Sequence, residues 1–355
     1  MKKLLVINQA PFGYHVDTYK YCQYLKNLYD ITYICIEPIN NKIEPFKGVK
    51  VEYVSRKFPR TIRGLLFLAV SLWNILFFKG KVFVVAQSPE YPRIIKKILF
   101  WKKMILDIRT LSIDKNEIVR ERQDFKLKKA CSLYEHISII SEELRGKLGL
   151  DKSRSSILPL GADIISNTNK KFEHKKLLYV GTLSGREIEK TIYGFSLFNE
   201  KYPDNNFLYD IIGDGFNDER ETLQSIVVAN NLQNKIKLYG FIPNNKLKCF
   251  FDSCTIGVAF VPQTPYYEYQ PSTKIYEYVL SGLFCIATST YANKELINDN
   301  NGVLTQDNAE SFAEILENIY LGKYVMNSES IKNTLIDCTW EEIVNSKLIP
   351  MLDKF

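Results

Sequence analysis

The 355-residue sequence contains few of the side chains that bind metal ions. It has only three histidines, which are far apart, and none of its seven cysteines forms a CxxC pair. It also contains no Asp-x-Asp motif. These absences exclude the ligand spacing of a structural zinc site, and we expect a protein that works without a metal or another cofactor. Because several cysteines lie inside apolar runs, the sequence favours buried free thiols in a reducing compartment.

A long hydrophobic run is also missing. The most apolar stretch covers residues 64–78, and its 15 residues are fewer than the ~20 that a membrane-spanning helix needs. The N-terminal residues do not resemble a signal peptide, because Asn8 interrupts their apolar run and no small-residue cleavage site follows. We therefore expect a cytoplasmic protein that is soluble, or bound peripherally at the inner face of the cell membrane.

Basic charge is concentrated in the first half of the chain. Residues 1–160 contain 29 Lys and Arg against 15 Asp and Glu, whereas the remainder contains 18 against 25. Within residues 56–103, basic and apolar side chains are interleaved, which favours an anionic membrane surface as a partner. Alternatively, these segments are helices that simply cover a sheet. No pattern of a nucleic-acid-binding module is present, so we expect no nucleic-acid partner.

Short apolar runs alternate with helical segments throughout the sequence. This order predicts an α/β fold with parallel sheets that carry helices on both faces. The polar stretch 161–176 predicts a linker, after which the alternation restarts. We predict two doubly wound, Rossmann-like domains, at residues 1–165 and 170–340, with a C-terminal helix at about 341–355 that packs back on the first. The carboxyl ends of both sheets are expected to border a ligand-binding cleft. The predicted strands are residues 3–8, 31–36, 49–54, 82–86, 104–108, 136–140, 157–160, 176–180, 207–212, 236–239, 256–260 and 284–287.

The most informative segment reads QPSTKIYEYVLSGLFCIAT. Pro271 stops the preceding element, and Ser272 or Thr273 can cap the helix that follows. The N-terminus of such a helix attracts a phosphate group, and Lys274 adds a positive charge there. Glu277 lies one turn further on and can accept hydrogen bonds from sugar hydroxyls. The alternative is an ordinary capped helix with a surface Lys/Glu pair.

A second segment, YVGTLSGREIEK, places two glycines and two basic residues after a predicted strand. A flexible loop that begins at Gly181 and carries Arg186 and Lys190 suits the charge of a diphosphate. The two basic residues are four apart, so a solvated helix face is the alternative. Gly213 and Gly240 follow two further strands, where tight turns let the backbone approach a ligand.

Five segments, in this order, resemble the family 4 glycosyltransferases, which have the GT-B fold of two Rossmann-like domains facing across a cleft. The segments read ILPLGAD, LLYVGTLSGREIEK, DIIGDG, IKLYGFIPNNKL and PSTKIYEYVLSGLFCIAT. The resemblance implies a retaining transfer of a sugar from a nucleoside-diphosphate-sugar to a saccharide or lipid-linked saccharide acceptor, in surface polysaccharide synthesis. It implies a donor-binding site formed by Gly13, Gly181, Arg186, Lys190, Gly213, Phe241, Ile242, Pro271, Ser272, Thr273, Lys274 and Glu277.

Two positions depart from the family's pattern. Glu277 matches the second glutamate of the family's Glu-x7-Glu motif, but the first falls on Tyr269, and Glu268 is one residue away. Either Glu268 supplies the catalytic carboxylate, or this subfamily lacks it. Thr182 stands where the family has an arginine, so that the nearest basic substitutes lie later in the same loop.

The resemblance also places site residues in the first half. The family's active-site residue maps to the segment LDIRT, where Asp107 would orient the acceptor or accept its proton and Arg109 would bind the leaving phosphate. The alternative is a structural ion pair at the end of a strand. In the opening loop, Tyr14 and His15 would contact the acceptor, although a capping or surface role is the alternative for His15.

Two other functions fit the same sequence. A sugar-nucleotide epimerase with the GT-B fold would share the two-domain layout and need no acceptor. A non-catalytic subunit that stabilises another transferase is supported by Tyr269 in the place of the first glutamate.

Overall fold

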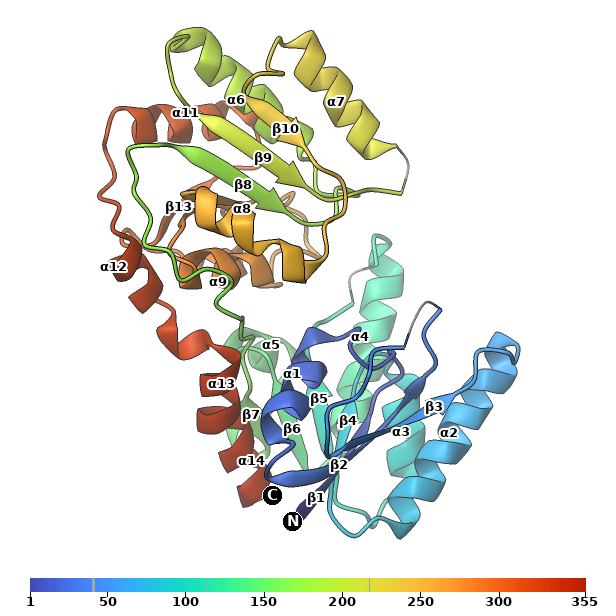
Figure 1. Cartoon of the computed structure of the whole chain (residues 1–355). Helices are drawn as coiled ribbons and strands as arrows, with labels where there is room; N and C mark the ends of the chain where they lie inside the picture. Colours follow the sequence, from blue (N-terminus) through green and yellow to red (C-terminus); the bar gives the residue numbers. More distant parts are fainter. Residues whose placement is uncertain (40–41, 113, 217) are drawn as a thin grey trace. The chain divides into compact units, whose positions relative to one another are not determined.

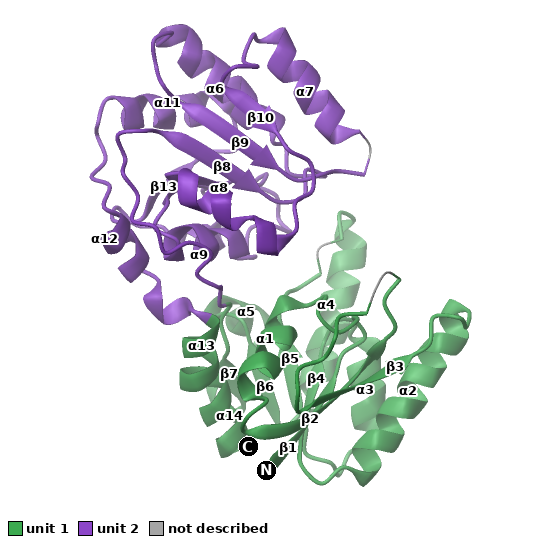
Figure 2. Ribbon diagram, in the orientation of Figure 1, with its two compact units in different colours: residues 1–160, 340–355 green, residues 161–339 purple. Residues whose placement is uncertain are grey.

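The computed structural model describes residues 1–39, 42–112, 114–216 and 218–355. These residues form two compact units, which are shown in different colours in Figure 2. Unit 1 comprises Met1–Leu160 together with Trp340–Phe355, and unit 2 comprises Gly161–Thr339. In each unit, helices cover a twisted parallel sheet (Figure 1). The predicted class, a doubly wound α/β fold with two parallel sheets, is therefore confirmed.

The sheet of unit 1 has seven strands in the order β3-β2-β1-β4-β5-β6-β7, and all its paired strands are parallel. The central strands are buried on both faces, which explains their nearly continuous apolar sequences. The strand order reverses direction between β1 and β4, the position at which such sheets bind ligands at their carboxyl ends. The strands are β1 (Lys2–Ile7), β2 (Tyr29–Ile36), β3 (Val49–Val54), β4 (Lys81–Val85), β5 (Ile105–Ile108), β6 (His136–Ile139) and β7 (Ser155–Ile157).

The C-terminal segment of the chain packs on unit 1. The Trp340 side chain is buried, and the centre of its ring lies 6.1 Å from that of the Tyr21 ring. Near the end of the chain, the Asp353 carboxylate pairs with Lys2 at 2.6 Å and accepts a hydrogen bond from the Tyr29 hydroxyl at 3.2 Å. The helices of unit 1 are α1 (Val16–Leu25), α2 (Arg60–Phe77), α3 (Glu90–Ile98), α4 (Glu117–Cys131), α5 (Glu142–Leu148), η1 (Lys152–Arg154), α13 (Trp340–Ile343), the π-helical turn η4 (Val344–Leu348) and α14 (Ile349–Lys354).

Helix α2 is longer than the apolar segment from which we expected it. Its 18 residues are long and apolar enough to cross a membrane, by length and composition alone, which corrects the expectation that this segment is too short. Three buried residues, Phe67, Ser71 and Ile75, recur at every fourth position and form one stripe. Because α2 contacts β2, β3 and α3, this stripe covers the sheet of unit 1.

The sheet of unit 2 has six parallel strands in the order β10-β9-β8-β11-β12-β13, and its order reverses between β8 and β11. The strands are β8 (Lys176–Val180), β9 (Leu208–Ile212), β10 (Ile236–Leu238), β11 (Ile256–Ala259), β12 (Phe284–Thr288) and β13 (Gly302–Thr305). The helices are α6 (Glu189–Lys201), α7 (Glu219–Ala229), η2 (Asn244–Lys246), α8 (Lys248–Ser253), α9 (Thr273–Leu280), α10 (Tyr291–Lys294), α11 (Ala309–Tyr320), α12 (Ser328–Asn333) and η3 (Ile336–Cys338).

The polar stretch 161–176, which we expected to be a linker, is packed against unit 2. Ser166 and Lys170 are buried in unit 2, although both are polar. The Ser166 hydroxyl donates to Asp252 at 2.7 Å, and the Lys170 ammonium donates to the carbonyl of Phe251. Burial lowers the pKa of Lys170 to about 8. Side-chain hydrogen bonds therefore attach this segment to unit 2.

Residues 157–160 do not form the strand that we expected, because β7 ends at Ile157. Pro159 has no N–H to donate to a sheet. In addition, the carbonyls of Leu158 and Pro159 accept hydrogen bonds from Arg109, at 2.7 and 3.4 Å. The segment therefore leaves the sheet while it stays attached to unit 1.

Candidate functional site

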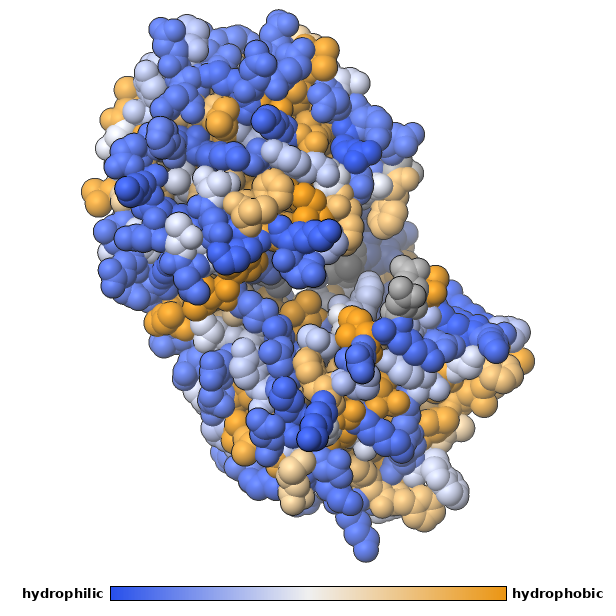
Figure 3. All heavy atoms as spheres, viewed as in Figure 1, coloured by the Kyte–Doolittle hydropathy of each residue, from blue (hydrophilic) through white to orange (hydrophobic). Residues whose placement is uncertain are grey.

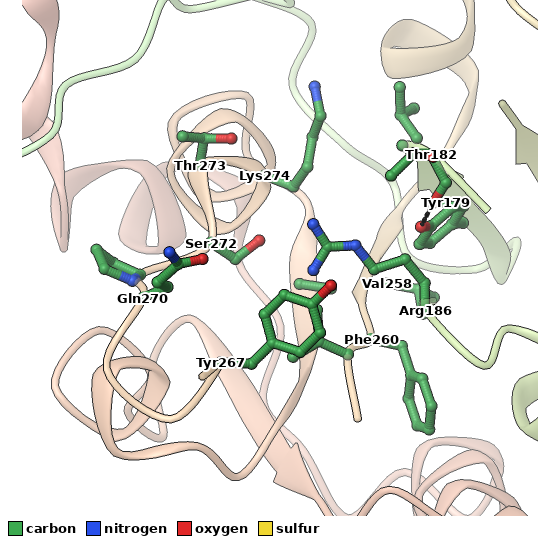
Figure 4. A pocket seen from close by; sticks show the side chains of 15 residues that line it. Tyr179, Thr182, Arg186, Val258, Phe260, Tyr267, Gln270, Ser272, Thr273 and Lys274 are labelled. Atoms are coloured by element: carbon green, nitrogen blue, oxygen red, sulfur yellow. Dashed lines mark hydrogen bonds between the residues drawn. The ribbon is translucent and has the colours of Figure 1, made fainter. Parts of the chain in front are cut away.

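A cavity of about 220 Å³ lies in unit 2 at the carboxyl ends of β8 and β11. These two strands are neighbours at the point where the strand order reverses, so the sheet itself creates the crevice. Figure 4 shows the side chains around it. They come from the end of β8, the loop that follows it, the end of β11 and the start of α9.

The first turn of α9 forms one wall of this cavity. Pro271, Ser272, Thr273 and Lys274 line it. Ser272 occupies the N-cap position, and its hydroxyl makes no capping hydrogen bond. Because the first N–H groups of a helix have no partner within the helix, this end carries partial positive charge. The wall is therefore suited to a phosphate.

Lys274 and Glu277 form an ion pair on α9, with 2.5 Å between Nζ and Oε2. Both side chains are largely buried. Lys274 lines the cavity, whereas Glu277 does not. In this structure the carboxylate of Glu277 thus holds the ammonium of Lys274 at the edge of the cavity.

Arg186 reaches the cavity from the loop after β8. Its guanidinium carbon lies 4.5 Å from the centre of the Tyr267 ring, and Figure 4 shows the two side chains together. The hydroxyl of Tyr179 donates to the carbonyl of Thr182 at 2.6 Å and closes this loop. Burial raises the pKa of Tyr179, and the charge of Arg186 opposes that rise. An arginine against an aromatic ring keeps its N–H edge free for an anion.

The charge of this cavity is positive. Arg186 and Lys274 line it, and no Asp or Glu is among the described residues of its wall. Of the predicted donor-binding residues, the structure brings together at this cavity Gly181, Arg186, Pro271, Ser272, Thr273 and Lys274.

Lys190, Gly213, Phe241, Ile242 and Glu277 do not line the cavity. Lys190 lies 2.6 Å from the carboxylate of Glu187 and 3.9 Å from that of Asp307. Gly213 packs directly against Gly181, because a Cβ built on Gly213 would lie 1.7 Å from the carbonyl oxygen of Gly181. Position 213 therefore requires a glycine, because its backbone approaches that of Gly181, which lines the cavity, too closely for a side chain.

Sequence reasoning missed several residues of the cavity, including Tyr179, Val258, Phe260, Tyr267 and Gln270. Tyr179 and Val258 belong to strands, where an apolar side chain indicates burial and gives no sign of a ligand. The one available signal was the aromatic pair at 266–267, directly before the helix that carries Lys274.

Glu268 is engaged away from the cavity. Its Oε1 accepts a hydrogen bond from the N–H of Tyr291 at 2.8 Å, and its main-chain carbonyl accepts from Ala292 at 3.0 Å. The neighbouring Tyr269 packs its ring 5.7 Å from that of Tyr291. Glu268 therefore anchors the segment before α9 to the start of α10, and its catalytic role stays a prediction.

In unit 1, Asp107 is completely buried at the end of β5. Its side chain is 0% exposed, its Oδ1 accepts a hydrogen bond from Ser138 at 2.5 Å, and its Oδ2 has no hydrogen-bond partner. Burial raises the pKa of Asp107 to about 6, against the opposing effects of Arg109 and Ser138. A carboxylate in this position does not reach a substrate, which favours the structural alternative.

Arg109 is likewise occupied. Its Nε donates to Asp17 at 2.5 Å, its Nη1 lies 3.8 Å from Asp107, and the guanidinium also donates to the carbonyls of Leu158 and Pro159. Only 14% of its side chain is exposed. The structure therefore uses this guanidinium to tie α1 and β5 to the segment after β7.

The two predicted acceptor-binding residues lie in different surroundings. Tyr14 is exposed and, with Gly13, lines a second cavity in unit 1. The Nδ1 of His15 lies 3.1 Å from the amide nitrogen of Asn8. Burial lowers the pKa of His15, which favours a neutral imidazole at neutral pH. His15 therefore holds the opening loop through its contact with Asn8.

Across residues 1–39, 42–112, 114–216 and 218–355, no three His, Cys, Asp or Glu side chains are grouped as a metal site requires. All seven cysteines are free, and five of them are buried.

The cavity lies in a segment that resembles a known protein family. Residues 174–321, which include its whole wall, match the family model described as "Glycosyl transferases group 1". No curated protein sequence matches the chain.

Several solved structures share the fold of the whole chain. A sucrose-phosphate synthase from Thermosynechococcus elongatus is 14% identical with a TM-score of 0.76, and the match covers 100% of this chain and 98% of that one. Anabaena HepE in complex with UDP and glucose is 13% identical with a TM-score of 0.75, over 100% of both chains. The lipopolysaccharide outer core galactosyltransferase WaaB is 15% identical with a TM-score of 0.72, over 99% of this chain and 100% of that one. The chain therefore has the GT-B fold, and its residues 174–321 match the family model of the group 1 glycosyl transferases.

Proposed function

We propose that this protein is a retaining glycosyltransferase that uses a nucleoside-diphosphate-sugar as donor and a saccharide or lipid-linked saccharide as acceptor. The synthesis of a surface polysaccharide is the process that we assign to it. The observation that best supports the donor is the positively charged cavity of unit 2, which lies within the segment that matches the family model. HepE, which has the same fold, binds UDP in its solved structure.

The cavity offers three kinds of positive charge to a diphosphate. Arg186 presents a planar guanidinium that can bind two phosphate oxygens at once. Lys274 is a mobile point charge, and a phosphate can replace Glu277 as its partner. The N-terminus of α9 adds its N–H groups. Such groups stabilise the negative charge that develops on the leaving diphosphate as the bond between the sugar and the diphosphate breaks.

We expect the Arg186→Ala and Lys274→Ala variants to bind UDP at least tenfold more weakly than the natural chain. Each substitution removes a charge-assisted contact, which contributes about 1.5–3 kcal/mol. Titration calorimetry with UDP measures the affinity, and circular dichroism shows whether each variant is folded.

The matched control is Lys190→Ala, which lies in the same region but pairs with Glu187 and Asp307. It should retain the UDP affinity of the natural chain. If Lys190→Ala weakens UDP binding while Arg186→Ala does not, the diphosphate lies elsewhere and the assignment of the cavity is wrong.

A second candidate is a nucleotide-sugar-binding subunit without transferase activity. It is favoured by Glu268, whose carboxylate is held by Tyr291 instead of lining the cavity. Release of UDP from UDP-glucose, with and without a saccharide acceptor, separates the two. Binding without release would favour the subunit, and acceptor-dependent release the transferase.

We also propose that unit 1 docks on an anionic membrane through the outer face of α2. Leu65, Trp73 and Phe77 are 68%, 66% and 62% exposed on this helix. Phe100 and Trp101, which follow α3, are exposed as well. In Figure 3, apolar side chains gather over α2, at the lower right. Basic residues at both ends of these helices add attraction to anionic lipids, at about 1 kcal/mol for each well-placed charge.

The double variant Trp73→Glu/Phe77→Glu should lose at least tenfold in its affinity for phosphatidylglycerol vesicles, because it places charge on the apolar face. Sedimentation with vesicles measures this affinity. The control, Leu321→Glu/Val325→Glu, changes two exposed apolar residues of unit 2. If both double variants sediment with the vesicles like the natural chain, α2 does not dock on the membrane.

A further inference from the structure

One wall of the cavity in unit 2 is an aromatic ring that lies against one of the positive charges. Tyr267 belongs to the loop between β11 and α9, and it lines the cavity together with Arg186 of the loop after β8. The guanidinium carbon of Arg186 is 4.5 Å from the centre of the Tyr267 ring, and Figure 4 shows the two side chains beside each other. Two loops that are far apart in the sequence therefore meet at this contact.

Apart from this ring, little in the structure restricts the side chain of Arg186. Its N–H donates to the carbonyl of Leu183 at 3.1 Å, which fixes the backbone of the loop but not the guanidinium. In the described part of the chain, no carboxylate lies within ion-pair distance of Arg186, whereas the nearby Lys190 and Lys274 are both paired. A long side chain without such a partner samples many rotamers, and a ring against its flat face reduces their number.

The loop that carries Tyr267 is attached to α10 through the next residue, Glu268. Oε1 of Glu268 accepts a hydrogen bond from the N–H of Tyr291 at 2.8 Å, and its main-chain carbonyl accepts from the N–H of Ala292 at 3.0 Å. These are the first two N–H groups of α10, which have no partner within the helix. A carboxylate at this end is also favoured by the helix dipole. Glu268 therefore joins its loop to a helix end by charge as well as by hydrogen bonds.

The same loop has a second attachment at Gln263. The N–H of Gln263 donates to Oδ2 of Asp307 at 2.9 Å, and its Nε2 donates to the carbonyl of Ser289 at 2.8 Å. Between the two attachments, the N–H of Tyr267 donates to the carbonyl of Thr264 at 3.0 Å. The backbone of Tyr267 thus lies in a turn that is held on both sides.

We propose that Tyr267 and Glu268 are positioning residues for Arg186. Glu268 fixes the loop, and the Tyr267 ring holds the guanidinium at the wall of the cavity, where its N–H groups face an incoming diphosphate. This inference rests on the proposed binding of a diphosphate at that cavity. It assigns Glu268, which does not line the cavity, a role in donor binding that acts through its neighbour and needs no contact with the sugar.

The first test compares Tyr267→Leu with Tyr267→Phe. Leucine removes the ring and should weaken UDP binding about three- to tenfold, whereas phenylalanine keeps the ring and should bind UDP within about twofold of the natural chain. Titration calorimetry measures the affinity, and circular dichroism shows whether each variant is folded. The control, Tyr193→Leu, changes an exposed tyrosine of α6 outside the cavity wall and should retain the UDP affinity of the natural chain.

The second test repeats the leucine substitution in a chain that already carries Arg186→Ala. If the ring acts through the guanidinium, Arg186→Ala/Tyr267→Leu should bind UDP as tightly as Arg186→Ala alone. A merely structural role predicts a different result, because a distorted loop would also displace the start of α9 and weaken UDP binding in both chains. A ring that contacts the nucleotide itself would do the same. Additive losses therefore overturn the proposal.

Glu268 is tested in the same two backgrounds. Glu268→Ala removes the acceptor for the N–H of Tyr291 and should weaken UDP binding about threefold, but only where Arg186 is present. Glu268→Gln keeps an oxygen acceptor and should bind UDP within about twofold of the natural chain. UDP carries no sugar for transfer, so a carboxylate that served only the transfer step would leave UDP affinity unchanged in both variants. Unchanged affinity in Glu268→Ala contradicts the proposal.

The outcome is separable from that of the proposed function. If Arg186→Ala weakens UDP binding while Tyr267→Leu does not, the donor cavity stands and the positioning role is wrong. If Arg186→Ala leaves UDP affinity unchanged, the assignment of the cavity fails, and the roles of Tyr267 and Glu268 fail with it. A loss in Tyr267→Leu that disappears in the Arg186→Ala chain supports both.

Discussion

The Gly213→Ala variant is expected to lose the folded structure of unit 2. Gly213 follows β9 with φ of +151°, a conformation that side-chain-bearing residues rarely adopt. A Cβ there would lie 1.7 Å from the carbonyl oxygen of Gly181 and 2.9 Å from its carbon. Both atoms belong to the backbone, so no side chain can rotate away.

The neighbouring backbone is fixed as well. The N–H of Gly213 donates to Gly240 at 2.9 Å, and the N–H of Gly181 donates to Ile212 at 3.0 Å. Relief of the clash therefore requires the ends of β8 and β9 to separate. We expect a loss of more than about 4 kcal/mol in the free energy of unfolding, and loss of UDP binding with it.

Denaturant unfolding followed by circular dichroism measures this effect, with Gly322→Ala as the control. Gly322 also has a positive φ, of +71°, but nothing lies within 4 Å of its Cβ position. Only the backbone strain remains there, and it should destabilise unit 2 by about 1–2 kcal/mol. A Gly213→Ala protein as stable as Gly322→Ala would show that β8 and β9 do not meet as described.

The second large effect concerns Asp107 and pH. Burial raises the pKa of this carboxyl from 3.8 to about 6 in the folded protein. The folded state therefore holds its proton more tightly than the unfolded state. The resulting stabilisation is fully present below pH 3.8 and is lost as the pH rises through about 6. The difference between the two pKa values corresponds to about 3 kcal/mol.

We expect Asp107→Asn to remove this dependence. Relative to the natural chain, the variant should become more stable by about 2–3 kcal/mol as the pH is raised from 4 to 8. The comparison uses the change with pH and not the stability at one pH, because the amide also alters the contact with Ser138. Urea unfolding of both proteins at several pH values measures the difference, and a constant difference would contradict the buried carboxylate.

Much of the fold was predictable from local sequence. Runs such as 3–8, 176–180 and 256–260 are apolar because strands of a parallel sheet are covered on both faces, and each matches an observed strand to within one residue at either end. Helices α4 and α11 and strand β13 escaped prediction. Few residues of α4 are buried, so its sequence carries only a weak helical period.

The candidate site was predictable only in part. The helix that begins with Thr273 and the basic residues after β8 follow from glycine, proline and charge patterns, and these patterns identified Lys274 and Arg186. The sequence did not show that Arg186 lines the cavity and that Lys190 does not. Both residues are basic and follow β8, but Arg186 lies in the loop beside Tyr267, whereas Lys190 lies in the first turn of α6 and pairs with the carboxylates of Glu187 and Asp307.

What the sequence determined by itself was the alternation of strands and helices, the two-part organisation, and the helix α9 with a lysine in its first turn. These properties depend on neighbouring residues, through hydrophobic periodicity, helix capping and turn residues. The tertiary structure decided that Asp107 is buried, that Tyr267 supports Arg186, and that arginines after β3 and in α2 share a cavity with the loop after β1. Strand order brings together segments that lie far apart in the chain, and no local pattern encodes which side chains then meet.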